Sequence, residues 1–239
     1  MENNYYISRT GNRAITGPEF FFIQPREFLT FNFLIMATEN KQIMHEAREA
    51  LKGKWGMAIG AFVIYIILTG SFQLLPRSVT FVSILVVAPM VLGLAVFSLR
   101  IARHQEANTG QIFEGFNRFG TALGAYFLMV LFALLWALLL IVPGIIAAIS
   151  YAQTFYIIAD DDRIGPMEAI DKSKAMMDGY KMKYFRMGLR FFGLALLCVL
   201  TLGIGFFWLM PFMQVTMARF YDDIKDRGAV EPQPEIMVE

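Results

Sequence analysis

Four long stretches of the chain carry no charged side chain, and these stretches constrain the fold more than any other feature of the sequence. They cover residues 55–76, 78–99, 119–159 and 191–218, with lengths of 22, 22, 41 and 28 residues. A helix needs about 20 apolar residues to cross the hydrocarbon core of a bilayer. A soluble protein with four such stretches would have too much apolar surface to cover. The sequence therefore predicts an all-α, polytopic integral membrane protein.

The uncharged stretches divide into three predicted helical hairpins. Arg77 separates the first two stretches, and Pro143-Gly144 breaks the third near its middle. The fourth stretch is too long for one ordinary span and too short for two. It forms a hairpin with shorter arms if its first helix starts at Tyr184 and the chain turns at residues 203–205. We expect six transmembrane helices in three hairpins, with five helices as the alternative.

The basic residues predict the orientation of these helices. Seventeen lysines and arginines lie between the hairpins and at their outer ends, whereas Arg77 alone lies in a hairpin tip. By the positive-inside rule, both termini and both long connectors are then cytoplasmic. The net charge of +1 gives no reason to expect a nucleic-acid partner. The expected partners are membrane lipids and, as a further option, another membrane protein.

The hairpins share features of an internal repeat. The sequence W-G-M-A-I-G-A-F at 55–62 aligns with F-G-T-A-L-G-A-Y at 119–126, although apolar helices also resemble one another by chance. Its glycines are predicted to form two helix-packing faces: Gly56, Gly60, Gly120 and Gly124. The aromatic residues that open the hairpins are predicted to anchor at the lipid headgroups: Trp55, Phe119 and Tyr184.

Each hairpin is preceded by a segment with the pattern of a short amphipathic helix, which we expect to lie at the membrane interface. Their apolar residues are Ile43, Ala47 and Leu51 in the first segment, Ile112, Phe113 and Phe116 in the second, and Met167, Ile170 and Met177 in the third.

The polar residues inside the hairpins are few. Gln153 and Gln214 each lie eight residues before an acidic pair, and they are the candidate polar contacts inside the membrane. Buried amides usually bond across helices, so helix packing is favoured over a substrate site. The acidic runs at 160–162 and 222–223 are read as helix ends beside basic residues, with a divalent-cation site as the alternative.

No template for a catalytic site fits the chain. His45-Glu46 lacks the second histidine of H-E-x-x-H, and the sequence contains no phosphate-binding G-K-[ST] and no G-x-S-x-G. No Asp, Glu or His falls inside a predicted span, which leaves no group for proton transfer there. With two histidines and one cysteine, we expect no catalytic residue, no cofactor and no metal site.

Four blocks of the sequence resemble a known family. They are A-R-E-A-L-K-G-K-W-G at 47–56, I-V-P-G-I-I-A at 141–147, E-A-I-D-K-S-K-A-M-M-D-G at 168–179, and L-G-I-G at 202–205 followed by Trp208 and Pro211. Together they resemble the bacterial membrane proteins of domain of unknown function 975, from about Met36 to Lys225. The resemblance implies a polytopic protein of the bacterial cytoplasmic membrane. Its layout is similar to that of the membrane domains beside some glycerophosphodiester phosphodiesterases.

The resemblance also sets the expected domain boundaries. Residues 36–225 form a single membrane domain. Residues 1–35 are expected to be a mis-annotated extension from an upstream start, or else a disordered cytoplasmic arm. Residues 226–239 are expected to be a disordered cytoplasmic tail.

Two functions remain compatible with the sequence. The first is a non-catalytic membrane scaffold or accessory protein, which the lack of charge inside the spans favours. The second is a small permease or lipid-handling protein, which would need a polar path lined by both glutamines.

Overall fold

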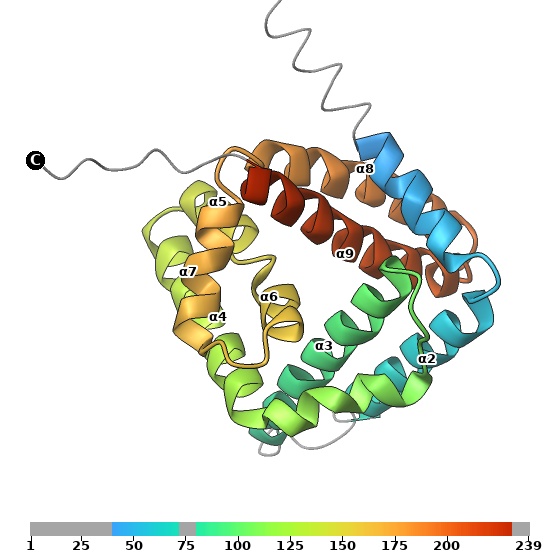
Figure 1. Cartoon of the computed structure of the whole chain (residues 1–239), viewed down its shortest axis with the longest axis horizontal. Helices are drawn as coiled ribbons and strands as arrows, with labels where there is room; N and C mark the ends of the chain where they lie inside the picture. The colour runs from blue at the N-terminus through green and yellow to red at the C-terminus, as the bar shows by residue number, and fades with distance from the viewer. Residues whose placement is uncertain (1–39, 72–79, 231–239) are drawn as a thin grey trace, which may run out of the picture. The chain divides into compact units, whose positions relative to one another are not determined.

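The computed structural model describes residues 40–71 and 80–230, in which every regular element is helical (Figure 1). The prediction of an all-α fold is confirmed for these residues. An N-terminal helix covers Asn40–Leu51. It is followed by α2 (Trp55–Ser71), α3 (Thr80–Ala102), the 3₁₀ helix η3 (Thr109–Arg118), α4 (Phe119–Leu139), α5 (Ile141–Ser150), α6 (Thr154–Asp160), α7 (Pro166–Met176), α8 (Lys181–Leu200) and α9 (Phe206–Val230).

Two of the predicted domain boundaries fall at the edges of the described part. The predicted extension, 1–35, lies outside the described residues. α9 runs through Val230, past the predicted start of the tail at residue 226, and residues 231–239 again lie outside the described part.

The second hairpin turns at a single residue. Leu140, in an extended conformation, separates α4 from α5, and Gly144 then packs against the backbone of Ala137. The sequence placed the break at Pro143-Gly144, but Pro143 lies in the first turn of α5. A proline is tolerated there because the N–H groups of the first turn have no partner within the helix. The turn therefore comes three residues before the proline.

The return arm of this hairpin is itself broken. α5 ends at Ser150, and α6 begins at Thr154 after a short turn. Side chains bond to the carbonyls at the break: Thr154 donates to the carbonyl of Tyr151 (2.8 Å), and Ser173 of α7 donates to that of Ser150 (2.7 Å). The break is thus held by hydrogen bonds inside the protein.

The third hairpin is formed by α8 and α9, which lie side by side in Figure 1. Residues equally far from the turn at 201–205 meet across it, as expected for antiparallel helices. The contacts are Cys198 with Gly205, the rings of Phe191 and Phe212 (5.7 Å between centroids), and those of Tyr184 and Phe220 (5.5 Å).

η3 packs closely against α3, and two glycines permit the contact. A Cβ added to Gly93 would lie 1.9 Å from the carbonyl oxygen of Ile112, and one added to Gly115 would lie 1.9 Å from that of Pro89. Since residue numbers rise along η3 as they fall along α3, the two segments are antiparallel. The backbones meet where no side chain intervenes.

The three predicted amphipathic segments are buried to different extents. In the first, the helix Asn40–Leu51, all three predicted apolar residues are buried. In η3, Ile112 is buried but Phe113 and Phe116 are exposed, because side chains three residues apart line up in a 3₁₀ helix. In the third segment, Ile170 and Met177 are buried and Met167 is exposed.

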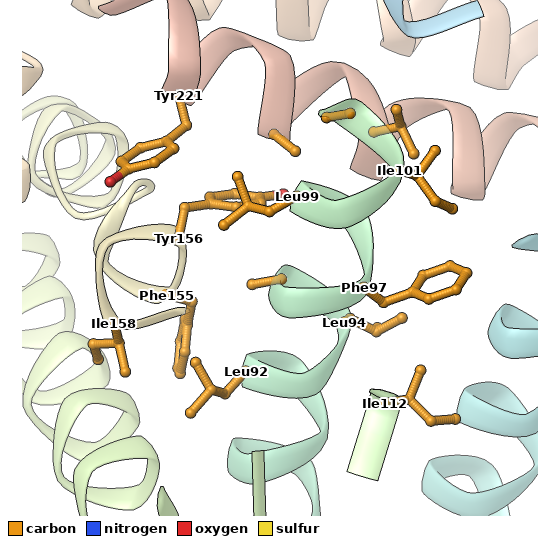
Figure 2. Packing of buried hydrophobic residues seen from close by; sticks show 14 of the residues in the cluster. Leu92, Leu94, Phe97, Leu99, Ile101, Ile112, Phe155, Tyr156, Ile158 and Tyr221 are labelled. Atoms are coloured by element: carbon orange, nitrogen blue, oxygen red, sulfur yellow. The ribbon is translucent and has the colours of Figure 1, made fainter. Parts of the chain in front are cut away.

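α3 contributes many of the side chains at the centre of the main core. Figure 2 shows Leu92 and Leu99 of α3 facing Phe155 and Tyr156 of α6. The ring of Tyr156 stacks on that of Tyr221 from α9, with 6.0 Å between centroids. Side chains of α3, α6 and α9 therefore share one core.

Three segments are long and apolar enough to cross a membrane: Ser83–Ala102, Thr109–Leu138 and Val142–Asp160. The bent pair Asn40–Leu51 and Trp55–Ser71 raises this number to four if it is one span. α8 and α9 do not meet the same criteria among the described residues, because charges occupy the first half of α8 and the second half of α9. Six spans were expected, with five as the alternative. The described residues contain at most four segments that are long and apolar enough to be spans.

α9 stays near one end of the α2–α3 pair. That end is marked by Lys54, whose ammonium donates to the carbonyl of Gln105 (2.8 Å). At the start of α9, Gly205 and Trp208 line the same groove as Trp55, the first residue of α2. Further along, Asp222 bonds to Arg103, one residue after the end of α3. A spanning α9 would move about 25 Å away from that end over these 17 residues.

Candidate functional site

Five polar side chains converge where α3, α6 and α9 meet. Arg103, just after α3, donates from Nη1 to Asp160 Oδ1 (2.6 Å) and from Nη2 to Asp222 Oδ1 (2.7 Å). Its Nε makes a second contact with the Asp222 carboxylate (3.2 Å). Tyr221 donates to Asp160 Oδ2 (3.0 Å), and Lys225 also donates to that oxygen. We call these five residues the helix-end cluster.

Hydrogen bonds and partial burial together set the charge states of the helix-end cluster. Hydrogen bonds from Arg103 to Asp222 and Asp160 raise the pKa of the guanidinium further above its usual value, so it stays protonated. Burial, together with the nearby Asp160 carboxylate, raises the pKa of the Tyr221 phenol, which stays neutral. The cluster therefore holds two carboxylates between an arginine, a lysine and a phenol donor.

A second ion pair lies beside the cluster. The Lys183 ammonium, only 1% exposed, donates to Asp223 Oδ2 at 2.6 Å and lies over the ring of Phe220. The backbone carbonyl of Lys183 accepts a hydrogen bond from the Asn40 amide (3.0 Å). This pair therefore ties the N-terminal helix, α8 and α9 together.

Arg118 holds the segment that follows α6. It donates to the carbonyls of Ile158 and Ile164 and to the Asp162 carboxylate (3.2 Å). Arg118 also lines a recess of about 460 Å³ between α3 and η3. Another arginine in that recess, Arg100, pairs with Glu114 at 3.1 Å.

The carboxylates of the two acidic runs, 160–162 and 222–223, bond mainly to basic side chains. Asp160, Asp162, Asp222 and Asp223 each accept a hydrogen bond from a basic side chain, as the reading of acidic helix ends beside basic residues expected. Within residues 40–71 and 80–230, no group of three or more His, Cys, Asp or Glu side chains is placed to hold a metal ion.

The two glutamines lie in different surroundings. Gln214 Oε1 accepts a hydrogen bond from the Tyr156 hydroxyl (3.1 Å), a contact between helices of the kind the sequence suggested. Gln153 is fully buried, and neither atom of its side-chain amide has a hydrogen-bond partner among the described residues. Its backbone N–H donates to Ser173 (3.2 Å). The structure does not bring the two side chains together through any hydrogen bond.

The predicted helix-packing glycines are not the positions of closest backbone contact. A Cβ added to Gly56, Gly60 or Gly120 would meet nothing within 4 Å in the described part of the chain, whereas one at Gly124 would lie 3.0 Å from the ring of Pro166. The closest contacts with backbone atoms involve Gly93, Gly115 and Gly144 instead. Of the four predicted glycines, Gly124 is thus the one that lies against another segment, at Pro166 of α7.

The three predicted aromatic anchors differ in exposure. Phe119 is 39% exposed at the start of α4, and its role as an anchor at the lipid headgroups stays a prediction. Tyr184 packs edge-on against Phe220, and Trp55 lines a groove beside α9; both are half-buried.

Sequence reasoning did not identify Arg103, Tyr221 or Lys183 as site residues. A signal was present in the repeat, because the exit of the first hairpin is basic where the exits of the other two are acidic. Opposite charges at equivalent positions suggest that the three exits meet.

Comparison with known proteins finds one family. No curated protein and no solved structure matches the chain. The family described as "Protein of unknown function (DUF975)" matches residues 36–152 and 138–228, which together cover most of the sequence. The likeness in layout to membrane domains beside glycerophosphodiester phosphodiesterases is not shown by this match and stays a prediction. The chain belongs to the DUF975 family.

Proposed function

We propose that this chain is a multi-pass protein of the bacterial cytoplasmic membrane that acts as a non-catalytic scaffold or accessory protein. The observation that carries the membrane location is the exposure of large apolar side chains. Leu138 is 84% exposed and Leu202 is 94% exposed. Apolar side chains are exposed over much of α4, α5 and α8: Phe127, Leu134, Leu135, Val142, Ile145, Leu189, Phe192 and Leu196. Hydrocarbon is the surrounding that stabilises so large an apolar surface.

The proposed topology keeps both termini in the cytoplasm. Four segments cross the bilayer: α2, α3, α4, and α5 with α6. The α8–α9 hairpin lies along the cytoplasmic interface, in place of the fifth and sixth spans of the sequence-based layout. The position of α9 at one end of α2 and α3 supports this arrangement. An even number of crossings leaves the connector at 161–180 and the C-terminus on one side.

The non-catalytic role rests on how the charged groups are used. In the helix-end cluster, the arginine, the lysine and both carboxylates bond to one another and join three helices. Such a cluster fixes the geometry of one face of the protein. A rigid face flanked by basic segments is suited to contact with headgroups or another membrane protein.

Fractionation tests the proposed membrane location, and reporter fusions test the proposed topology. The full chain should stay in the membrane pellet after alkaline carbonate extraction. Reporters fused after Arg103, Asp178 and Glu239 should report the cytoplasm, and one inserted at Arg77 should report the periplasm. Carbonate extraction of the chain, or a periplasmic signal at Asp178, would contradict the proposal. Turnover of a lipid or soluble substrate by the purified chain would contradict its non-catalytic part.

A further inference from the structure

A groove of about 830 Å³ lies between the N-terminal helix and the α8–α9 hairpin. In Figure 1 the N-terminal helix, drawn in blue, lies beside this hairpin. One wall of the groove carries basic side chains, and the other is formed by apolar residues near the hairpin tip. The lining residues include no aspartate or glutamate. The groove is therefore basic on one side and apolar on the other.

The basic wall is one face of the N-terminal helix. Lys41, His45 and Arg48 are spaced by four and three residues, so they project from the same side, and all three are exposed. Among the described residues, Lys41 and Arg48 have no ion-pair partner, and His45 is 3.9 Å from Glu49 of its own helix. Glu49 lies near enough to Arg48 to interact with its charge, but among the described residues neither Lys41 nor Arg48 forms an ion pair, so both permanent charges at the groove are available to a ligand.

The apolar wall comes from both arms of the hairpin. It is lined by Leu194 and Leu197 of α8, by Trp208 and Phe212 of α9, and by Trp55. Leu197 and Trp208 remain 58% and 52% exposed. Aromatic side chains of this kind are typical of the zone where headgroups meet hydrocarbon.

An occupant that matches both walls has an anionic end and a long apolar part. We propose that this groove binds one anionic phospholipid of the cytoplasmic leaflet, with its phosphate at Lys41 and Arg48 and an acyl chain along Leu197 and Trp208. This inference rests on the proposed membrane location. A single lipid would then contact both walls of the groove, with its headgroup at the basic wall and its acyl chain at the apolar wall. A basic pocket beside membrane helices is a known way to hold an anionic headgroup.

The test uses the full chain purified in mild detergent and delipidated. Phosphatidylglycerol is then added, and native mass spectrometry counts the bound lipids, with phosphatidylcholine as the zwitterionic comparison. We expect one phosphatidylglycerol to remain bound under conditions that remove phosphatidylcholine, and to raise the melting temperature. Glycerol phosphate and inorganic phosphate, which lack acyl chains, should have no such effect. Equal stabilisation by either anion would overturn the proposal.

A matched pair of double variants isolates the basic wall. Lys41→Gln with Arg48→Gln removes both charges from the groove, and phosphatidylglycerol affinity should fall about 30-fold, since each basic residue near an anionic lipid contributes about fivefold. Arg163→Gln with Lys172→Gln removes the same charge from exposed positions outside the groove and should leave affinity unchanged. Equal affinity in both double variants would overturn the proposal. So would a lipid-free dimer in which a second copy fills the groove.

The outcome also separates this inference from the proposed function. If the groove variant resists carbonate extraction and keeps its lipid, the lipid site is wrong and the membrane location stands. If the wild-type chain is extracted by carbonate, the membrane location itself is wrong.

Discussion

At the scale of single residues, Arg103 is the side chain of the helix-end cluster that bonds to both carboxylates. Arg103→Ala leaves Asp160 and Asp222 facing each other without the guanidinium, and both carboxylates are largely buried. We expect this to lower the free energy of unfolding by about 2 kcal/mol, less than for a fully buried pair because Arg103 keeps contact with water.

Thermal unfolding in detergent measures this effect against Arg163→Ala. Arg163 is exposed on the loop after α6, and its change should stay within about 0.5 kcal/mol of the parent. If Arg103→Ala and Arg163→Ala have the same melting temperature, the helix-end cluster does not stabilise the fold.

The sequence revealed the charges of this cluster, but not their pairing. Asp222 was visible as an acidic residue at a helix exit, and Lys225 was visible beside it. The partner that Lys225 finds is Asp160, 65 residues earlier, because α6 and α9 pack together. Such pairing depends on tertiary contacts that no local pattern encodes.

At the scale of elements, the contact between η3 and α3 depends on two glycines. Gly115→Ala would place a methyl group 1.9 Å from the Pro89 carbonyl, which must then move. Overpacking of this kind costs about 3 kcal/mol. Gly60→Ala meets open space in a helix and should be neutral or stabilising by up to about 1 kcal/mol.

Comparison of the melting temperatures of Gly115→Ala and Gly60→Ala tests whether the close packing contact lies at Gly115 or at the repeated motif. A larger loss for Gly60→Ala than for Gly115→Ala would restore the repeated motif as the main packing contact. The sequence could not make this choice, because a glycine is needed only where another backbone crosses. The crossing point of η3 on α3 follows from the loop between them and not from the motif.

Whether the α8–α9 hairpin crosses the membrane can be tested at its tip. Leu202, at the turn, has a positive φ and is almost fully exposed. We expect Leu202→Cys, in a Cys198→Ala background, to stay unlabelled by a membrane-impermeant maleimide added to the periplasmic side of intact spheroplasts. The control variant Arg77→Cys, in the same Cys198→Ala background, should be labelled under the same conditions. Labelling at residue 202 from the periplasm would restore the six-span layout.

The exposed face of α8 is compatible both with the two spans predicted for this hairpin and with a hairpin that lies in the membrane plane. Its apolar residues recur at spacings of three and four along the helix: Met182, Phe185, Leu189, Phe192 and Leu196. A lipid-facing side of a spanning helix and an in-plane amphipathic helix share this pattern. The contacts of α9 with the ends of α2 and α3 support the in-plane arrangement that we propose, and those contacts are not local.

At the scale of the whole molecule, the family match begins at residue 36. That position agrees with the boundary taken from the sequence blocks, and it leaves 1–35 outside the shared part. A chain that starts at Met36 should therefore accumulate in the membrane to the same level as the full chain. Quantitative blotting of membrane fractions measures this. A truncated chain that fails to insert would show that the first 35 residues are needed.

The sequence was most informative about the whole molecule and least informative about its contacts. Helical class followed from the uncharged stretches, since their length leaves few alternatives to apolar helices. Length and charge, counted for each stretch separately, predict six spans, whereas four helical segments at most are long and apolar enough to cross a membrane among the described residues. The position of α9 across the end of α2 and α3 could be known only from the packed chain.

The helix-end cluster also imposes an order in time on synthesis. Asp160 follows Arg103 by 57 residues and Asp222 follows it by 119. At about 5–20 residues per second, the second carboxylate leaves the ribosome about 6–24 s after the arginine. During that interval Arg103 has at most one of its two carboxylates. A chain interrupted within its last hairpin would keep an incompletely neutralised arginine at the membrane surface, so the completed cluster distinguishes finished chains from unfinished ones.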